Sequence, residues 1–109
     1  MISQEQYKLF ERQAEVAKAV AHPLRIAVLH FLKDGPRCVC DIAAFVGAER
    51  SNVSRHLAVM VAAGVLESRK QGLNVIYSVK CPCMLDFFAC TTGVIKRQAK
   101  DSQRLLRAM

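Results

Sequence analysis

The chain has 109 residues and is 52% hydrophobic, which is enough for one packed domain, too few residues for two, and not the composition of a disordered chain. Lysine and arginine total 16 against 9 acidic residues, so the formal net charge is +7 and a polyanionic partner such as DNA, RNA or an anionic membrane is favoured. No run of about 18 apolar residues predicts a membrane span. The N-terminal segment is polar and acidic, unlike a signal peptide, so we expect a cytoplasmic protein with no membrane partner.

The first third of the chain predicts two helices. The later of the two helices begins at Pro23, because proline suits the first turn of a helix, and it ends at Asp34-Gly35-Pro36. One of its sides carries Leu24, Val28 and Phe31, while Leu29 and others add apolar bulk. The first helix covers residues 4–21, where steps of three and four make one apolar stripe of Tyr7, Phe10, Ala14, Ala17 and Ala21.

A pair of short helices with a glycine turn follows. The third helix covers about residues 38–46 and ends at Gly47, a residue that tolerates positive φ. Ala43 stands four residues before Gly47, so a small residue lies where two helices cross and a flexible residue lies in the turn. The fourth helix covers about residues 51–63 and is closed by Gly64, with an inward face of Val53, Leu57, Met60 and Val61. This pattern predicts a helix-turn-helix over about residues 38–63.

A β-hairpin and a final helix complete the chain. Residues 65–70 and 74–79 read as strands, with Gln71-Gly72 as the turn between them. Residues 84–107 are helical in pattern, and a role for this helix in dimerisation and sensing is what the resemblance described below implies. The predicted fold is therefore mainly α with a β-hairpin, a winged helix-turn-helix of order α-α-α-α-β-β-α. It forms a single DNA-binding domain over residues 1–109, with the wing at about 65–79.

The fourth helix carries side chains that suit DNA. No acidic residue occurs between positions 50 and 63, and polar groups there can bond phosphate oxygens or base edges in a major groove. The candidate contacts are Arg50, Ser51, Asn52, Ser54, Arg55 and His56. The alternative is an ordinary solvated helix face, with His56 as a packing residue. Arg69 and Lys70 at the hairpin tip fit a minor groove or the backbone, or else a charged edge that discourages strand pairing.

Five cysteines are the candidate sensor. In a reducing compartment they are better read as metal or redox ligands than as a disulfide framework, although buried small hydrophobes are the plain alternative. Thiolates favour soft ions, and arsenite and lead accept three of them, whereas zinc usually takes four ligands. Five cysteines with no convergent histidines therefore favour a three-thiolate site drawn from Cys38, Cys40, Cys81, Cys83 and Cys90.

Helix geometry leaves two arrangements open. Cys38 and Cys40 point about 200° apart on a regular helix, so both reach one ion only if the helix start unwinds. Cys81 and Cys83 lie in an extended segment and converge more easily, but Cys83 and Cys90 are about 10 Å apart along a straight helix axis. In the first arrangement Cys81, Cys83 and Cys90 form the site, with adjustment or across a dimer. In the second, Cys38 and Cys40 join a cysteine from the last segment.

Several short runs together resemble the ArsR/SmtB family of metal-sensing repressors over about residues 14–80. They are Arg37-Cys38-Val39-Cys40-Asp41-Ile42, Ser54-Arg55-His56-Leu57, Gly64-Val65-Leu66 and Arg69-Lys70-Gln71-Gly72. The first run resembles the metal box of the arsenic-sensing branch. The resemblance implies a homodimer through the first and last helices and a fourth helix that reads double-stranded operator DNA. It also implies a repressor that releases its operator when an inducer such as As(III) binds.

Two departures from the family pattern shape the hypothesis. Where arsenic sensors place a third cysteine, this chain has Ala43, and no histidine follows His56, which argues against a zinc, nickel or cobalt site on the last helix. A cadmium or lead sensor, a thiol-redox or persulfide sensor and a non-sensing architectural DNA binder are the alternatives. No phosphate loop, His-Glu-x-x-His motif or nucleophile elbow is present, so neither an enzyme nor an organic cofactor is expected.

Overall fold

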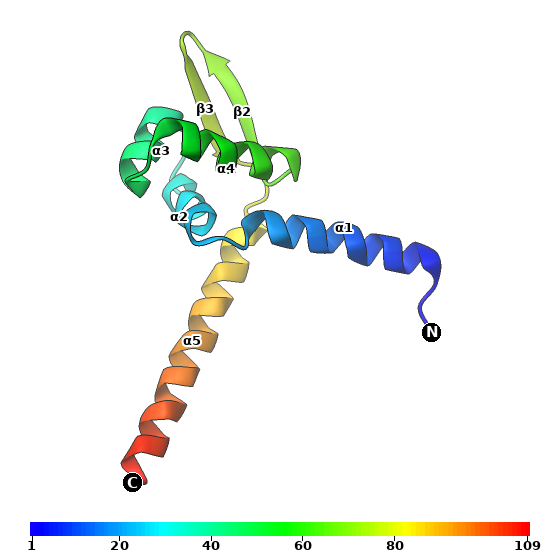
Figure 1. Ribbon diagram of the computed structural model, residues 1–109, viewed down its shortest axis with the longest axis vertical. Coiled ribbons are helices and arrows are strands. Elements are labelled where there is room, and N and C mark those ends of the chain that lie inside the picture. The colour runs from blue at the N-terminus through cyan, green and yellow to red at the C-terminus, as the bar shows by residue number, and fades with distance from the viewer.

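The computed structural model describes residues 1–109 as five helices and three short strands. They are α1 (Gln4–Val20), α2 (Pro23–Leu32), β1 (Arg37–Cys38), α3 (Val39–Val46), α4 (Arg50–Ala62), β2 (Leu66–Gln71), β3 (Asn74–Val79) and α5 (Cys83–Arg107). Helices α2, α3 and α4 pack together at the base of the β2–β3 hairpin. Helices α1 and α5 project away from this centre in different directions (Figure 1).

The hydrophobic core lies between the central helices and the hairpin base. Leu29, Ile42 and Leu57 have no exposed surface, so each of α2, α3 and α4 contributes a fully buried side chain. The predicted inner side of α2 is only partly right, because Leu24 and Phe31 are half-buried whereas Leu29 lies at the centre. This core fixes the position of α4 relative to the rest of the fold.

The turn between α3 and α4 follows the predicted glycine chemistry. Gly47 has φ 67°, and its N–H donates a hydrogen bond of 2.9 Å to the carbonyl of Ala43. Ala43 is buried where α3 packs against α4, as expected for a small residue at a helix crossing. The chain therefore enters α4 at Arg50 with its direction set by a left-handed residue.

The sheet has one strand that the sequence did not reveal. Its order is β1-β3-β2, all antiparallel, and Cys38 of β1 pairs with Ile76 of β3. Helix α3 consequently begins at Val39, and Cys38 is its N-cap rather than its first residue. The predicted turn is displaced by one residue, because Gln71 pairs with Asn74 and leaves Gly72 and Leu73 as the two-residue loop.

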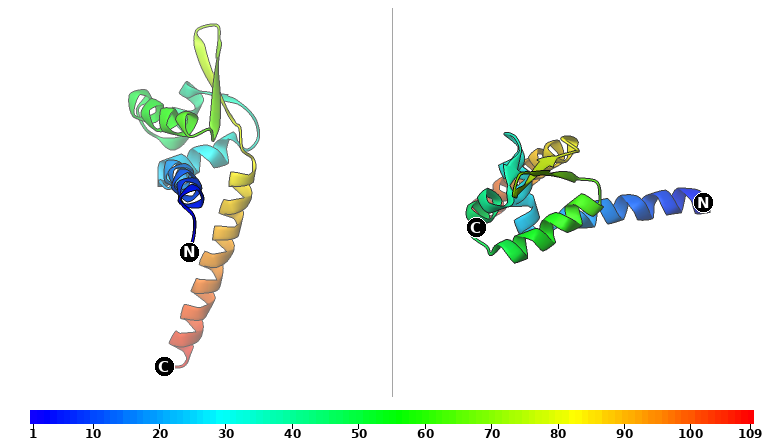
Figure 2. Two further views of the ribbon diagram at one scale, coloured as in Figure 1. Left: turned by 90° about the vertical axis from the view of Figure 1, so that its right-hand side faces the viewer. Right: turned by 90° about the horizontal axis from the view of Figure 1, so that it is seen from above.

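The apolar stripe of α1 is uncovered in the single chain. Tyr7 and Phe10 are 57% and 45% exposed, and Ile95 on α5 is 64% exposed. Figure 2 shows α5 extending away from the central helices in its left-hand view and α1 extending away from them in its right-hand view. The two helices thus carry apolar side chains that the rest of the chain does not bury. No helix, including the 25-residue α5, combines the length and apolar character needed to cross a membrane.

Candidate nucleic-acid interface and thiol site

The outer face of α4 presents most of the predicted contact residues to solvent. Val53 and Leu57 are fully buried on the inner side, which turns the opposite side outward. Arg55 donates a hydrogen bond of 3.1 Å from its guanidinium to the side-chain oxygen of Asn52. This hydrogen bond holds the side chains of two predicted contact residues together. The exposed members of the set are Arg50, Ser51, Ser54 and Arg55, while Asn52 is half-buried.

His56 lies apart from this outer face. Its Nδ1 accepts a hydrogen bond of 3.0 Å from Nε of Arg25, and its ring centroid is 4.5 Å from that of His22. Burial first, and then the electrostatic influence of the neighbouring His22, Arg25 and Arg55, lower the pKa of His56 from its ordinary value. His56 therefore has the geometry of the alternative packing role. Its neutral imidazole on α4 accepts a hydrogen bond from Arg25 on α2 and so connects the two helices.

His22 and His56 lie side by side but are not part of a group of side chains that could hold a metal ion. Their rings are in contact, but the Nδ1 atoms of both already accept hydrogen bonds. Leu24 donates its backbone N–H to His22 Nδ1 at 3.1 Å, and Arg25 occupies Nδ1 of His56. Two imidazoles engaged in this way stabilise the α2 start and its contact with α4, rather than form part of a metal site.

The hairpin adds positive charge beside α4. Arg69 and Lys70 are exposed, and they pair in register with Ile76 and Val75 close to the loop. The hairpin projects as a narrow ribbon beyond α4 (Figures 1 and 2). Between residues 50 and 80 only Glu67 is acidic, against five basic residues: Arg50, Arg55, Arg69, Lys70 and Lys80.

Two of the five free cysteines are in direct contact. Sγ of Cys81 lies 2.8 Å from Sγ of Cys83, and the hydrogen bond between the thiols is the largest cause raising the pKa of Cys83. The turn after β3 produces this contact, because the N–H of Met84 donates to the carbonyl of Cys81 at 3.1 Å. The predicted extended segment is absent, because Pro82 is helical (φ −59°, ψ −24°) and Cys83 is the first residue of α5, so a turn rather than an extended chain brings the two sulfurs together.

The other three cysteines lie separately. Cys38 is half-buried, and its Sγ accepts a hydrogen bond of 3.4 Å from the N–H of Asp41. Cys40 is exposed on the first turn of α3, and Cys90 is exposed on the continuous helix α5. Within one chain, no three cysteine, histidine or acidic side chains are placed together to hold a metal ion. The single chain thus assembles two thiols of the predicted site.

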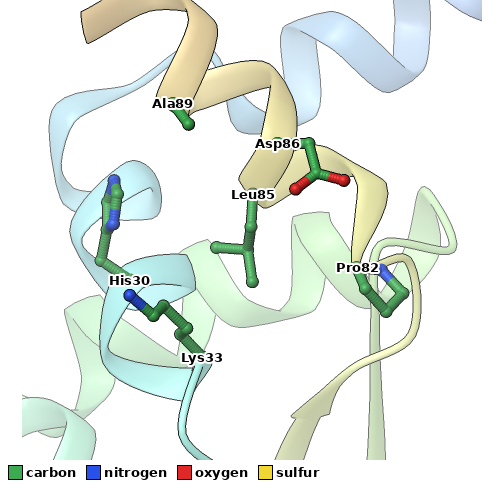
Figure 3. A pocket seen from close by; sticks show the side chains of 6 residues that line it. All are labelled: His30, Lys33, Pro82, Leu85, Asp86 and Ala89. Atoms are coloured by element: carbon green, nitrogen blue, oxygen red, sulfur yellow. The ribbon is translucent and has the colours of Figure 1, made fainter.

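A pocket beside the thiol pair joins α5 to α2. It has a volume of about 380 Å³ and contains side chains from both helices (Figure 3). Leu85 packs against the core, and the ring of the buried Phe88 on α5 lies 6.4 Å from that of His30 on α2, so the first turns of α5 are in contact with α2. A movement of the Cys81–Cys83 segment would therefore change the packing of α5 against α2. The lining residues are His30, Lys33, Pro82, Leu85, Asp86 and Ala89.

The two short helices, the glycine turn and the hairpin define a winged helix-turn-helix fold. Residues 22–68 match the family described as bacterial regulatory protein, arsR family. The HTH-type transcriptional regulator Rv0081 of Mycobacterium tuberculosis is 35% identical over 99 residues, covering 90% of this chain and 87% of that protein. Its crystal structure gives a TM-score of 0.74 at 37% identity, covering 91% of this chain and 97% of that one. The chain belongs to the ArsR/SmtB family, whose members are transcriptional regulators rather than enzymes.

Two further similarities bear on assembly and sensing. The winged helix-turn-helix domain Mb0332 of Mycobacterium bovis is described as homodimeric, with a TM-score of 0.78 at 26% identity over 91% of this chain and 92% of that one. A cadmium resistance regulatory protein, a CadC homologue of Staphylococcus aureus, is 33% identical over 67 residues. That match covers 61% of this chain and 55% of the homologue, so it spans about half of that protein.

Proposed function

We propose that the chain is a homodimeric repressor that binds operator DNA and releases it when a soft thiophilic ion binds its cysteines. The acid-free outer face of α4 is the observation that carries the DNA-binding part. In this proposal α4 enters the major groove, where Arg55 and Asn52 contact base edges and Arg50 contacts phosphate. Ser51 and Ser54 add hydroxyl groups, while Arg69 and Lys70 of the wing contact the minor groove or the backbone.

The uncovered helices support the dimer. The apolar side chains of α1 and α5 need a partner surface, and a second copy of the chain offers the same two helices by two-fold symmetry. The homodimeric state described for Mb0332 is consistent with this assembly. A two-fold dimer presents two copies of α4 to half-sites about one helical turn of DNA apart, which is about 34 Å.

The DNA-binding proposal is tested with Arg55→Ala and a matched control, Arg107→Ala. Arg107 is the last residue of α5, at the opposite end of the molecule from the hairpin (Figure 1). Both variants lose one positive charge, so a general effect of net charge lowers DNA affinity equally. We expect Arg55→Ala to weaken binding to the chain's own promoter by about tenfold or more, which is 1.4 kcal/mol or more, with Arg107→Ala close to wild type. Equal affinities of the Arg55→Ala and Arg107→Ala variants for the promoter at physiological salt would contradict the proposal that α4 reads the DNA.

The inducer we propose is trivalent arsenic, with cadmium or lead as the alternatives. Cys81 and Cys83 already supply two sulfurs 2.8 Å apart, and As(III) takes three thiolates. The third thiolate comes from Cys90, across the dimer or after an adjustment of the α5 start, or from Cys38 or Cys40. Because Leu85 joins this segment to the core, drawing in a third sulfur moves α5 against α2 and so changes the spacing of the two reading helices.

Single replacements by serine test the thiol site. Cys81→Ser, Cys83→Ser and Cys90→Ser are compared for the concentration of arsenite that releases promoter DNA. We expect the first two to lose most of the response while their DNA affinity without arsenite is unchanged. A full response in all three variants would reject the arrangement built on this segment and favour one built on Cys38 and Cys40.

The 2.8 Å contact between Cys81 and Cys83 also favours a second candidate function, a thiol-redox or persulfide switch in the same fold. An oxidant of the peroxide or polysulfide class would remove two electrons and two protons from the pair and leave a sulfur bridge. The two candidates differ in a direct measurement. Binding of As(III) gives thiolate-to-arsenic absorbance and adds the mass of arsenic, whereas a disulfide loses the mass of two hydrogens, or a polysulfide bridge gains whole sulfur atoms, without that absorbance.

A further inference from the structure

The outermost residue of the hairpin is a leucine with no packing partner. Leu73 is fully exposed at the second position of the two-residue loop between β2 and β3. Its neighbours Lys70, Gln71 and Asn74 are polar or charged and also exposed. An isolated branched apolar side chain is thus held at the tip of a projecting ribbon.

Turn chemistry does not explain this leucine. Gly72 has φ 63° and no other residue type in the chain has a positive φ, so glycine alone supplies the left-handed conformation that the hairpin loop needs. The position after it needs no apolar side chain, and polar residues such as asparagine or serine are usual in turns. Leaving Leu73 in water forgoes the favourable free energy of burying its apolar surface. A binding partner that covers it would recover this free energy.

Charge around Leu73 indicates a polyanionic partner. From Ser68 to Leu85 the sequence contains no acidic residue, and Arg69, Lys70 and Lys80 are basic. An apolar tip flanked by cations suits a nucleic-acid groove, where cations contact the phosphates and the apolar group contacts the bases. A protein surface with a hydrophobic pocket would not account for the uniformly positive surroundings.

We propose that Leu73 is a minor-groove wedge. As α4 occupies the major groove, the wing tip places Leu73 against a neighbouring base-pair step, partly unstacks it and bends the duplex. Such wedges act most easily at flexible pyrimidine–purine steps, so Leu73 confers a preference for TA or CA steps at a position that the reading helix does not contact. This inference rests on the proposed DNA-binding function and adds a second source of sequence preference to it.

The test compares Leu73→Asn, Leu73→Met and Arg69→Ala on duplexes selected from random-sequence DNA by the wild-type dimer. Asparagine suits the turn and keeps the hairpin, methionine keeps an apolar tip, and Arg69→Ala removes a cation only. The probes carry 2-aminopurine, whose fluorescence rises when its base unstacks, at the step that the wing reaches.

We expect Leu73→Asn to lower affinity by about tenfold, to abolish the fluorescence rise and to leave the salt dependence unchanged, since no charge is lost. Leu73→Met should retain the rise. Arg69→Ala should bind more weakly with a salt slope reduced by about one, yet keep the rise. Wild-type binding without a fluorescence rise, or a rise that survives in Leu73→Asn, overturns the wedge and leaves the repressor proposal standing. A wild-type protein that selects no duplex overturns both.

Discussion

Nε of Arg25 donates a hydrogen bond of 3.0 Å to Nδ1 of His56, while a terminal nitrogen of the same guanidinium donates one of 3.3 Å to the carbonyl of Ala19. One arginine at the start of α2 therefore links the last turn of α1 to the helix proposed to read DNA. In the proposed dimer α1 is part of the interface, so this arginine connects the interface to the reading helix. The link requires His56 to be neutral, because a protonated imidazole has no acceptor at Nδ1.

The first prediction concerns the pH dependence of stability through His56. Burial and the electrostatic influence of its neighbours His22, Arg25 and Arg55 lower its pKa in the folded protein below the ordinary 6.5. The unfolded chain then binds more protons as the pH falls below about 6.5, so this stability is fully present above that pH and is lost below it. Urea unfolding of wild type and His56→Gln at about pH 8 and pH 5.5 measures the effect.

We expect the wild type to lose more stability between the two pH values than His56→Gln, whose amide still accepts from Arg25 but does not titrate. The matched control is His30→Gln, at an exposed position on α2. This control should follow the wild type. If His56→Gln and the wild type lose the same amount, the Arg25–His56 contact does not govern the acid sensitivity.

The second prediction concerns Gly47, which sets the angle between α3 and α4. A Cβ at this position meets no atom within 4 Å, so space is available and only the φ of 67° opposes a side chain. Gly47→Ala should therefore destabilise the fold by about 1–2 kcal/mol, the cost of a left-handed L-residue. Gly47→Asn should be less destabilising, because asparagine tolerates this conformation better. Thermal or urea unfolding checks the order, and equal losses for alanine and asparagine would show that φ is not the cause.

The third prediction concerns the surface proposed for dimerisation. Ile95 is 64% exposed on α5, which also carries the exposed side chains of Val94, Leu105 and Leu106. Ile95→Asp should convert the dimer to a monomer in analytical ultracentrifugation, because an unpaired carboxylate in an apolar interface is costly to desolvate. The affinity of the Ile95→Asp variant for promoter DNA should fall as the dimer is lost.

The matched control for this surface is Lys100→Asp. At 100° per residue Lys100 is about 140° around α5 from Ile95, so a new carboxylate there lies away from the apolar stripe. This variant should remain dimeric. Dissociation of both variants, or of neither, would contradict the assignment of the stripe to the interface.

Local patterns in the sequence were sufficient for the helix-turn-helix and insufficient for the contacts made across the fold. Gly47 and Gly64 end helices with φ of 67° and 82°, and a positive φ is a property of the residue itself. Strand β1 has only two residues and exists through pairing with β3, about 40 positions later, so no periodicity reveals it. The partner of His56 is Arg25, 31 residues earlier, for the same reason.

The thiol site shows the same division. The sequence predicted that Cys81 and Cys83 converge in an extended segment; their sulfurs are 2.8 Å apart, but the convergence comes from a turn, because Pro82 is helical and Cys83 begins α5. The sequence pattern predicted that Cys38 lies within a helix, whereas the pairing of β1 with β3 makes this residue the N-cap of α3. The uncovered stripe on α1 was visible in the sequence, but what covers it depends on a second chain and not on a local pattern.

The last prediction separates the structural role of Cys38 from a sensing role. Its sulfur accepts the N–H of Asp41, so Cys38→Ser should keep the cap and the stability, while Cys38→Ala should lose about 1 kcal/mol. If the inducer binds around Cys81 and Cys83 without this residue, Cys38→Ser should release promoter DNA at the same arsenite concentration as wild type. Cys40→Ser, on the same helix but without a capping bond, should be equally responsive. A serine variant that keeps full stability and yet ignores arsenite would place Cys38 among the ligands, because hydroxyl replaces thiol as a cap but does not bind As(III) with comparable strength.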